Sequence, residues 1–116
     1  MGEFFRRLPG PAVLVAGCGE GRDSRHLQGL GARVVSFDLS EGMLSLARAA
    51  DPAGSYLRAD LRDAGSIGGS FDGIWACASL VHLPTSDMLD VLGQLGMLLR
   101  PGGKLFVSVM SSGRTG

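Results

Sequence analysis

The sequence predicts an α/β fold in which helices cover the faces of a parallel sheet. Short continuous apolar runs at 13–16 and 105–107 are typical of strands buried on both faces. Segments with helical spacing of apolar side chains separate such runs, and a parallel return between neighbouring strands needs a connection of about helical length. Glycines at 17, 19 and 21 follow the first run, so a strand, a glycine loop and a helix come in that order.

Local signals set the expected boundaries in the first half of the chain. Gly31 stops the first helix, because glycine is favoured just past a helix end. Ser40 occupies the N-cap position of the second helix, with Glu41 in its positive first turn. Pro52 ends that helix, since proline disfavours helix in the residue before it. The expected elements are a strand at 13–16, a helix at 22–30, a strand at 33–37, a helix ending near residue 50 and a strand at 55–58.

The second half is less regular. Residues 59–70 are rich in Gly, Ser and Asp, which predicts a loop with one helical turn. Thr85 is expected to cap a third helix, which the turn at 101–103 ends. Strands are expected at 71–77 and 105–109, before a frayed tail. The third helix is expected to bury one face, which consists of Met88, Leu92, Leu95 and Leu99.

Composition narrows the class of protein. The 116 residues fit one domain, spanning 1–116, and 45% hydrophobic residues suffice for one core. Eleven basic and eleven acidic side chains cancel without blocks of either sign, which argues against nucleic acid or a membrane surface as partner and favours a small molecule. Two cysteines without metal-ligand spacing predict no metal site, and no signal-peptide pattern opens the chain, so a cytoplasmic location is expected.

The topology of a parallel sheet selects the candidate site. Ligands of such sheets bind beyond the carboxyl ends of the strands, and the glycine loop at 17–21 follows the first strand. Asp38 ends the second strand 19 residues after Gly19, where a carboxylate can accept hydrogen bonds from the ribose hydroxyls of an adenosine. A dinucleotide site would need a third glycine where Arg22 stands, so a nicotinamide-dependent oxidoreductase is the weaker alternative.

Five ordered segments resemble motifs of class I methyltransferases that use S-adenosylmethionine. The resemblance covers 13–109, which is most of the chain. It implies a Rossmann-like, doubly wound, mainly parallel sheet of five strands in the order 3-2-1-4-5, and S-adenosylmethionine as the cofactor. The segments are Val-Leu-Val-Ala-Gly-Cys-Gly-Glu-Gly at 13–21, Val-Ser-Phe-Asp-Leu-Ser at 35–40, Ala-Asp-Leu at 59–61, Phe-Asp-Gly-Ile-Trp-Ala-Cys at 71–77 and Leu-Leu-Arg-Pro-Gly-Gly-Lys-Leu at 98–105.

The resemblance also implies roles for single residues. The glycine loop would border the methionine part of the cofactor, Asp38 would hold the ribose, and Asp60 would meet the adenine amino group. Two structural alternatives stay open, because Met43 is also suited to the core and Asp60 to capping a turn. The expected cofactor-binding residues are Ala16, Gly17, Cys18, Gly19, Asp38, Leu39, Met43, Asp60, Leu61 and Cys77.

Methyl transfer from a sulfonium needs alignment more than side-chain chemistry, and a proton acceptor helps when the nucleophile is oxygen or an amine. His82 is the candidate for that role, although a histidine that merely closes the cleft is the structural alternative. The resemblance thus implies methyl transfer, and the balanced charge favours a small-molecule acceptor.

Two departures from the family pattern define the alternatives. Val15 stands where the family commonly has an acidic residue, and the seven residues after Val109 leave no room for the usual terminal antiparallel strands. The alternatives are a domain that binds S-adenosylmethionine without methylating and a fragment truncated after the fifth strand. An uncovered fifth-strand edge would also favour a homo-oligomer.

Overall fold

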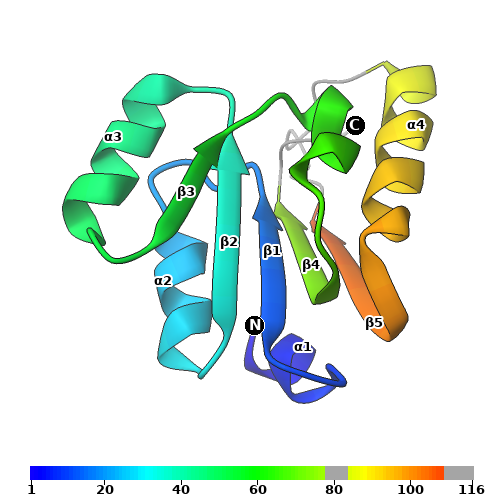
Figure 1. The fold of residues 1–116 in the computed structure, drawn as a ribbon, viewed down its shortest axis with the longest axis horizontal. Helices are drawn as coiled ribbons and strands as arrows, with labels where there is room; N and C mark the ends of the chain where they lie inside the picture. The colour runs from blue at the N-terminus through cyan, green and yellow to red at the C-terminus, as the bar shows by residue number, and fades with distance from the viewer. Residues whose placement is uncertain (78–83, 109–116) are drawn as a thin grey trace, which may run out of the picture.

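A five-stranded parallel sheet forms the centre of the computed structural model, which describes residues 1–77 and 84–108 (Figure 1). The strands lie in the order β3-β2-β1-β4-β5, and every neighbouring pair is parallel. The predicted fold class and strand order are therefore confirmed. The strands are β1 (Ala12–Ala16), β2 (Arg33–Asp38), β3 (Ser55–Arg58), β4 (Phe71–Cys77) and β5 (Leu99–Ser108).

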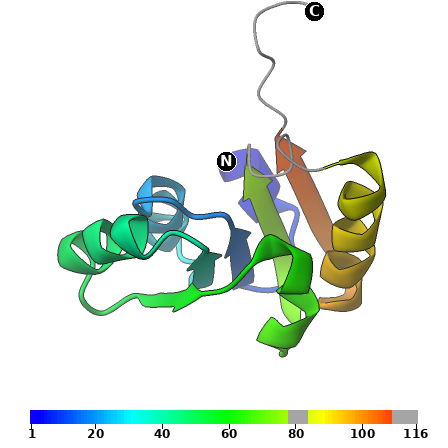
Figure 2. The same cartoon turned by 90° about the horizontal axis from the view of Figure 1, so that it is seen from above.

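Helical segments cover both faces of the sheet. One apolar cluster joins the strands to η1 and α4, and a second joins them to α1, α2 and α3. In Figure 2, α1 and α4 lie on opposite sides of β4 and β5. None of the helices in the described ranges is long and apolar enough to cross a bilayer. The helices are α1 (Gly2–Arg6), α2 (Arg22–Gly29), α3 (Glu41–Ala50) and α4 (Thr85–Met97), and η1 (Leu61–Ile67) is a 3-10 helix.

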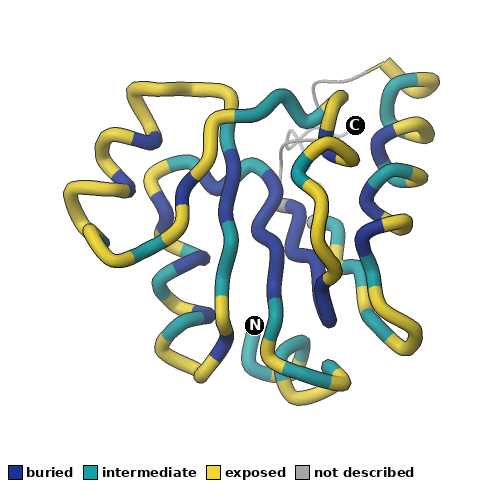
Figure 3. The backbone as a smooth tube through the Cα atoms, in the orientation of Figure 1, coloured by how far each residue is buried: buried dark blue, intermediate teal, exposed yellow. Residues whose placement is uncertain are grey.

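The central position of β1 explains its unbroken apolar run. Its neighbours β2 and β4 pair with it at both edges and helices cover both of its faces, so β1 is buried along most of its length (Figure 3). Leu14 and Ala16 belong to the cluster under η1 and α4, whereas Val13 and Val15 belong to the cluster under α1, α2 and α3. A strand at the centre of such a sheet has no solvent-facing side, and every second residue therefore need not be polar.

The second helical segment confirms the predicted capping. The Ser40 side chain accepts a hydrogen bond from the backbone N–H of Met43 at 3.2 Å, which satisfies a donor in the first turn of α3. Asp51 follows the last residue of α3, in agreement with the stop expected before Pro52. The α2 helix is fixed to β2 by a buried pair of hydroxyls, since the Ser24 and Ser36 oxygens lie 2.6 Å apart.

The two ends of α4 each correct a prediction. Thr85 is the first helical residue rather than the cap, because Pro84 holds the N-cap position without a side-chain hydrogen bond. Leu99 was expected on the buried face of the helix, but it pairs with Phe71 and begins β5. The reason is that the Leu98 carbonyl accepts from the Phe71 N–H at 2.8 Å, which commits the chain to the sheet. The fifth strand therefore starts earlier than residue 105, and Val109 lies outside the described residues.

A buried carboxylate joins three segments at the amino ends of the strands. Asp72 is 3% exposed, and its Oδ2 atom accepts from the backbone N–H of Ala12 and from the Arg100 guanidinium, each at 3.0 Å. Gly10 leaves room for it, because a Cβ at Gly10 would lie 2.6 Å from the same oxygen. Asp72 thus ties β4 to the starts of β1 and β5.

Candidate functional site

The candidate site lies at the carboxyl ends of β1 and β2, next to the point between β1 and β4 where the strand order reverses. From β1 the chain proceeds through β2 to β3 at one edge, then returns to β4 on the other side of β1. Crevices at such a switch are where open parallel sheets bind ligands. The loop after β1 and the last residue of β2 meet here, as predicted.

The glycine loop is held against β2 by its backbone. The N–H groups of Gly17 and Cys18 both donate to the Phe37 carbonyl, each at 2.9 Å. Gly19 adopts φ +56°, a conformation that L side chains rarely adopt, and a Cβ built on it would meet no atom within 4 Å. The backbone at Gly19 therefore faces open space that a ligand can approach closely.

Asp38 connects this loop to the start of α3. One carboxylate oxygen accepts from the Gly19 N–H at 2.8 Å, and the other accepts from the Ser40 N–H at 2.9 Å. Each oxygen of a carboxylate can accept more than one hydrogen bond. Asp38 is only half-buried, so it has capacity left for hydroxyl groups of a ligand while it orders the loop.

A cavity of about 310 Å³ opens between the glycine loop and α3. Two apolar side chains at this end of the molecule are exposed, Leu39 at 52% and Met43 at 43%. Met43 lines the cavity and does not belong to the core, which answers the structural alternative raised from the sequence. The lining residues are Cys18, Gly19, Glu20, Arg22, Asp23 and Met43.

Cys18 is unsuited to nucleophilic chemistry at neutral pH. Burial, with a further contribution from the Asp38 charge, raises the pKa of its thiol to about 11. The reactive form of cysteine is the thiolate, which such a pKa suppresses. Its role in the loop is therefore that of a small buried side chain.

The remaining predicted site residues are not among those that line this cavity in the described part of the structure. Asp60 caps η1, and its carboxylate accepts from the backbone and guanidinium of Arg62, which lowers the pKa of the Asp60 carboxyl. Ala16 belongs to the core cluster beneath η1 and α4, and the half-buried Leu61, the first residue of η1, packs against that cluster. Cys77 ends β4, with its side chain outside the described part, and His82 also lies outside the described residues.

Three side chains at the start of α2, which are not among the cofactor-binding residues expected from the sequence, also line the cavity. These are Glu20, Arg22 and Asp23. Asp23 is further fixed by Trp75, whose indole N–H donates to its carboxylate at 3.0 Å. The sequence offered one indication that these three residues could line the site, namely that they come directly after Gly19 where a helix begins.

In the ranges that the structure describes, no three metal-ligating side chains cluster.

Comparison with known proteins gives a consistent result. A family model described as "Methyltransferase domain" matches residues 13–103. Among curated proteins, the malonyl-[acyl-carrier protein] O-methyltransferase of Serratia marcescens is 36% identical over 105 residues, which are 90% of this chain and 40% of that protein. The ubiquinone biosynthesis O-methyltransferase of Xanthomonas campestris pv. campestris is 36% identical over 109 residues, covering 90% of this chain and 45% of that one.

Solved structures agree with these relatives. An S-adenosylmethionine-dependent methyltransferase from Mesorhizobium loti shares 30% identity at a TM-score of 0.77, over 90% of this chain and 49% of that one. DesVI of Streptomyces venezuelae shares 26% identity at a TM-score of 0.85, over 98% of this chain and 49% of that one. The chain thus spans less than half the length of these proteins.

Proposed function

The chain belongs to the class I S-adenosylmethionine-dependent methyltransferase family, and on this premise we propose that it binds S-adenosylmethionine at the glycine loop and transfers its methyl group to a small-molecule acceptor. The observation that carries the proposal is the junction of Gly19 and Asp38. The glycine presents bare backbone to a cavity, and the carboxylate beside it keeps acceptor capacity at the end of the neighbouring strand.

The residues around this junction fit the parts of the cofactor. Asp38 accepts the ribose hydroxyls while its bond to the Gly19 N–H keeps the loop in place. Leu39 and Met43 flank the adenine, since both expose apolar surface at this end of the sheet. Asp60 and Leu61 follow the neighbouring strand β3, and Asp60 must share its oxygens with Arg62 to reach the adenine amino group.

The residues at the start of α2 would hold the methionine end of the cofactor. When bound, the cofactor supplies a methyl group already activated by its sulfonium, so the protein has to position the two reactants. Gly17, Cys18 and Gly19 border the methionine part, and Asp23, held by the Trp75 indole, places a carboxylate near its amino group. The backbone near Cys77 faces the sulfonium from β4, and His82 takes the proton of the acceptor.

Isothermal titration calorimetry with three ligands tests the proposal. We expect saturable heat with S-adenosylmethionine and with S-adenosylhomocysteine, and none with NAD, because Arg22 replaces the glycine that a dinucleotide needs. Binding of NAD alone would refute the proposal. Binding of both sulfur compounds without formation of S-adenosylhomocysteine in an acceptor screen would refute the transfer step and leave a binding domain.

The cytoplasmic location expected from the sequence is part of this proposal, as is self-association. β5 is an edge of the described sheet, and Met97 at the end of α4 is 85% exposed beside it. Edge strands with unpaired backbone groups favour pairing with a second chain. We expect light scattering to show a dimer at high micromolar concentration, and a strictly monomeric protein would contradict it.

A further inference from the structure

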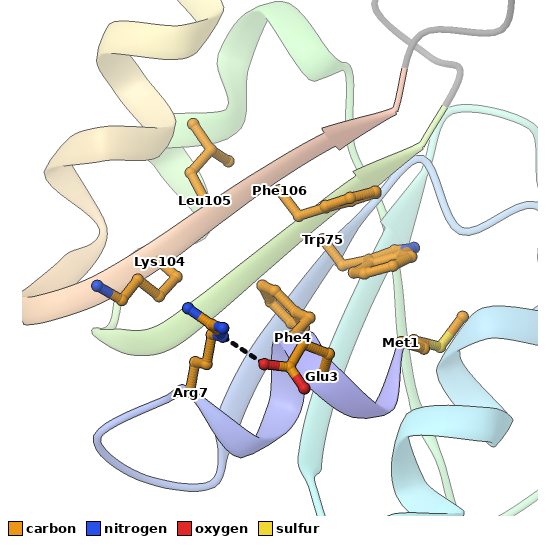
Figure 4. Close-up of a pocket in the computed structure, with 8 residues that line it drawn as sticks. All are labelled: Met1, Glu3, Phe4, Arg7, Trp75, Lys104, Leu105 and Phe106. Carbon is orange, nitrogen blue, oxygen red and sulfur yellow. Dashed lines mark hydrogen bonds and ion pairs between the residues drawn. The ribbon is translucent and has the colours of Figure 1, made fainter.

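A second cavity, separate from the glycine loop, lies over β4 and β5 on the side of α1 (Figure 4). Its volume is about 400 Å³, within the range of small-molecule pockets. Aromatic rings form its apolar surface, and charged side chains stand around them. The lining residues are Met1, Glu3, Phe4, Arg7, Trp75, Lys104, Leu105 and Phe106.

Three aromatic rings from three segments form a rigid apolar surface. Trp75 and Phe106 are stacked, with ring centroids 4.0 Å apart and an interplanar angle of 11°. Phe4 meets Trp75 edge-on, with centroids 5.0 Å apart. The bond from the Trp75 indole to Asp23 fixes the orientation of that ring. Phe106 remains 37% exposed, so one aromatic surface is available to a flat ring from solution.

The charge around the cavity favours an anion. Glu3 is already paired with Arg6 and Arg7, and the hydrogen bond from Arg7 lowers the pKa of the Glu3 carboxyl. Lys104 is exposed, and the ion pairs of the described residues do not include it. One carboxylate and two cations thus line the cavity, which leaves a net positive charge.

We propose that this cavity binds a flat aromatic carboxylate, with its ring against Phe106 and Phe4 and its carboxylate toward the ammonium of Lys104. Charge complementarity and the preformed aromatic surface select this occupant over an uncharged apolar one. The proposal does not require methyl transfer, because the cavity shares no lining residue with the glycine-loop site, although the hydrogen bond from Trp75 to Asp23 connects the walls of the two.

The chain supplies its own reporter for a binding test. Trp75 is its single tryptophan and lines the cavity, so intrinsic fluorescence responds to an occupant directly. The probe is benzoate, titrated into the cofactor-free protein. Two comparison ligands are benzamide, which lacks the charge, and cyclohexanecarboxylate, which lacks the flat ring. We expect a saturable change with benzoate and at least fivefold weaker binding of both comparison ligands.

Matched variants test whether benzoate binding depends on the positive charge of Lys104 itself or on the net charge of the whole protein. Lys104 is the only lysine of the chain, and Lys104→Gln is expected to weaken benzoate about tenfold, the loss of one hydrogen bond to a charged group. Arg33→Gln removes one positive charge from an exposed residue outside the cavity, and should leave benzoate binding within twofold. Phe106→Leu should weaken benzoate and benzamide alike, because both have a flat ring, while leaving cyclohexanecarboxylate nearly unchanged.

Three results would overturn the proposal. One is the absence of a saturable signal with benzoate in a protein whose thermal unfolding is cooperative. Another is equal affinity for benzoate and either comparison ligand. The third is a Trp75 emission spectrum that changes with protein concentration in step with a dimer seen by light scattering, because a second copy would then fill the cavity. Each result can occur whether or not S-adenosylmethionine binds, so failure here is distinct from failure of the proposed function.

Discussion

Replacing Asp38 with asparagine should weaken binding of S-adenosylhomocysteine roughly tenfold to 100-fold, the loss of about one to two charge-assisted hydrogen bonds. The carboxylate now accepts from the N–H groups of Gly19 and Ser40 and has capacity left for ribose hydroxyls. An amide has one accepting oxygen, so a backbone donor and the ribose compete for it. Calorimetry measures the affinity, and thermal unfolding checks that the variant is folded.

A double-mutant cycle separates the ribose contact from general loosening of the loop. The second change is in the ligand, from S-adenosylhomocysteine to its 2′,3′-dideoxy analogue. If Asp38 holds the ribose, removing the hydroxyls costs the wild type far more than it costs Asp38→Asn. Asp63→Asn, a neutralised carboxylate at an exposed position of η1, should leave both affinities unchanged. Equal losses in wild type and Asp38→Asn would reject the ribose contact.

Replacing Asp72 with alanine should lower the free energy of unfolding by about 2 to 3 kcal/mol. The substitution leaves the Ala12 N–H without its acceptor and separates Arg100 from the carboxylate that holds it. For a chain of this size the midpoint of thermal unfolding should fall by roughly 10 °C. Urea and thermal unfolding followed by circular dichroism measure both quantities.

Two further variants show how much of this loss of unfolding free energy comes from the ion pair with Arg100. Arg100→Gln removes only the ion pair, and because the Arg100 side chain is 45% exposed, the cost should be about 1 kcal/mol or less. Asp63→Ala removes an exposed carboxylate and should stay within about 0.5 kcal/mol of the wild type. An Asp72→Ala protein as stable as Asp63→Ala would show that the buried carboxylate does not hold the strand ends together.

The sequence predicted a helix or strand correctly wherever the residues of that one segment were enough to specify it. The apolar run at 13–16, the Ser40 cap and the glycines after β1 each produced the expected structure. The prediction was wrong at Leu99, where helical spacing continued past the end of the helix. Its state depends on Phe71, 28 residues away in sequence, which recruits it into the sheet. The spacing of apolar residues within one segment cannot show that a distant strand competes with the helix for the same residue.

For the site, the sequence marked the loop and the strand ends but not the partners of each side chain. Asp38 was expected to face a ribose, and the structure shows in addition that it orders Gly19 and Ser40. Asp60 was expected near the adenine, which stays a prediction, and the structure shows that its carboxylate also accepts from the Arg62 guanidinium. Asp23 lines the cavity, and the indole N–H of Trp75, 52 positions away in sequence, donates to its carboxylate.

By itself the sequence determined the α/β class, the strand boundaries of the first half and the glycine loop with its acidic partner. Those features depend on short-range preferences: buried strands need continuous apolar runs, and left-handed backbone needs glycine. Only the tertiary structure decided the open space at Gly19, the Asp72 junction and the aromatic cavity of Phe4, Trp75 and Phe106. Each of these joins residues far apart in the chain, and their contacts exist only after the sheet has brought the segments together.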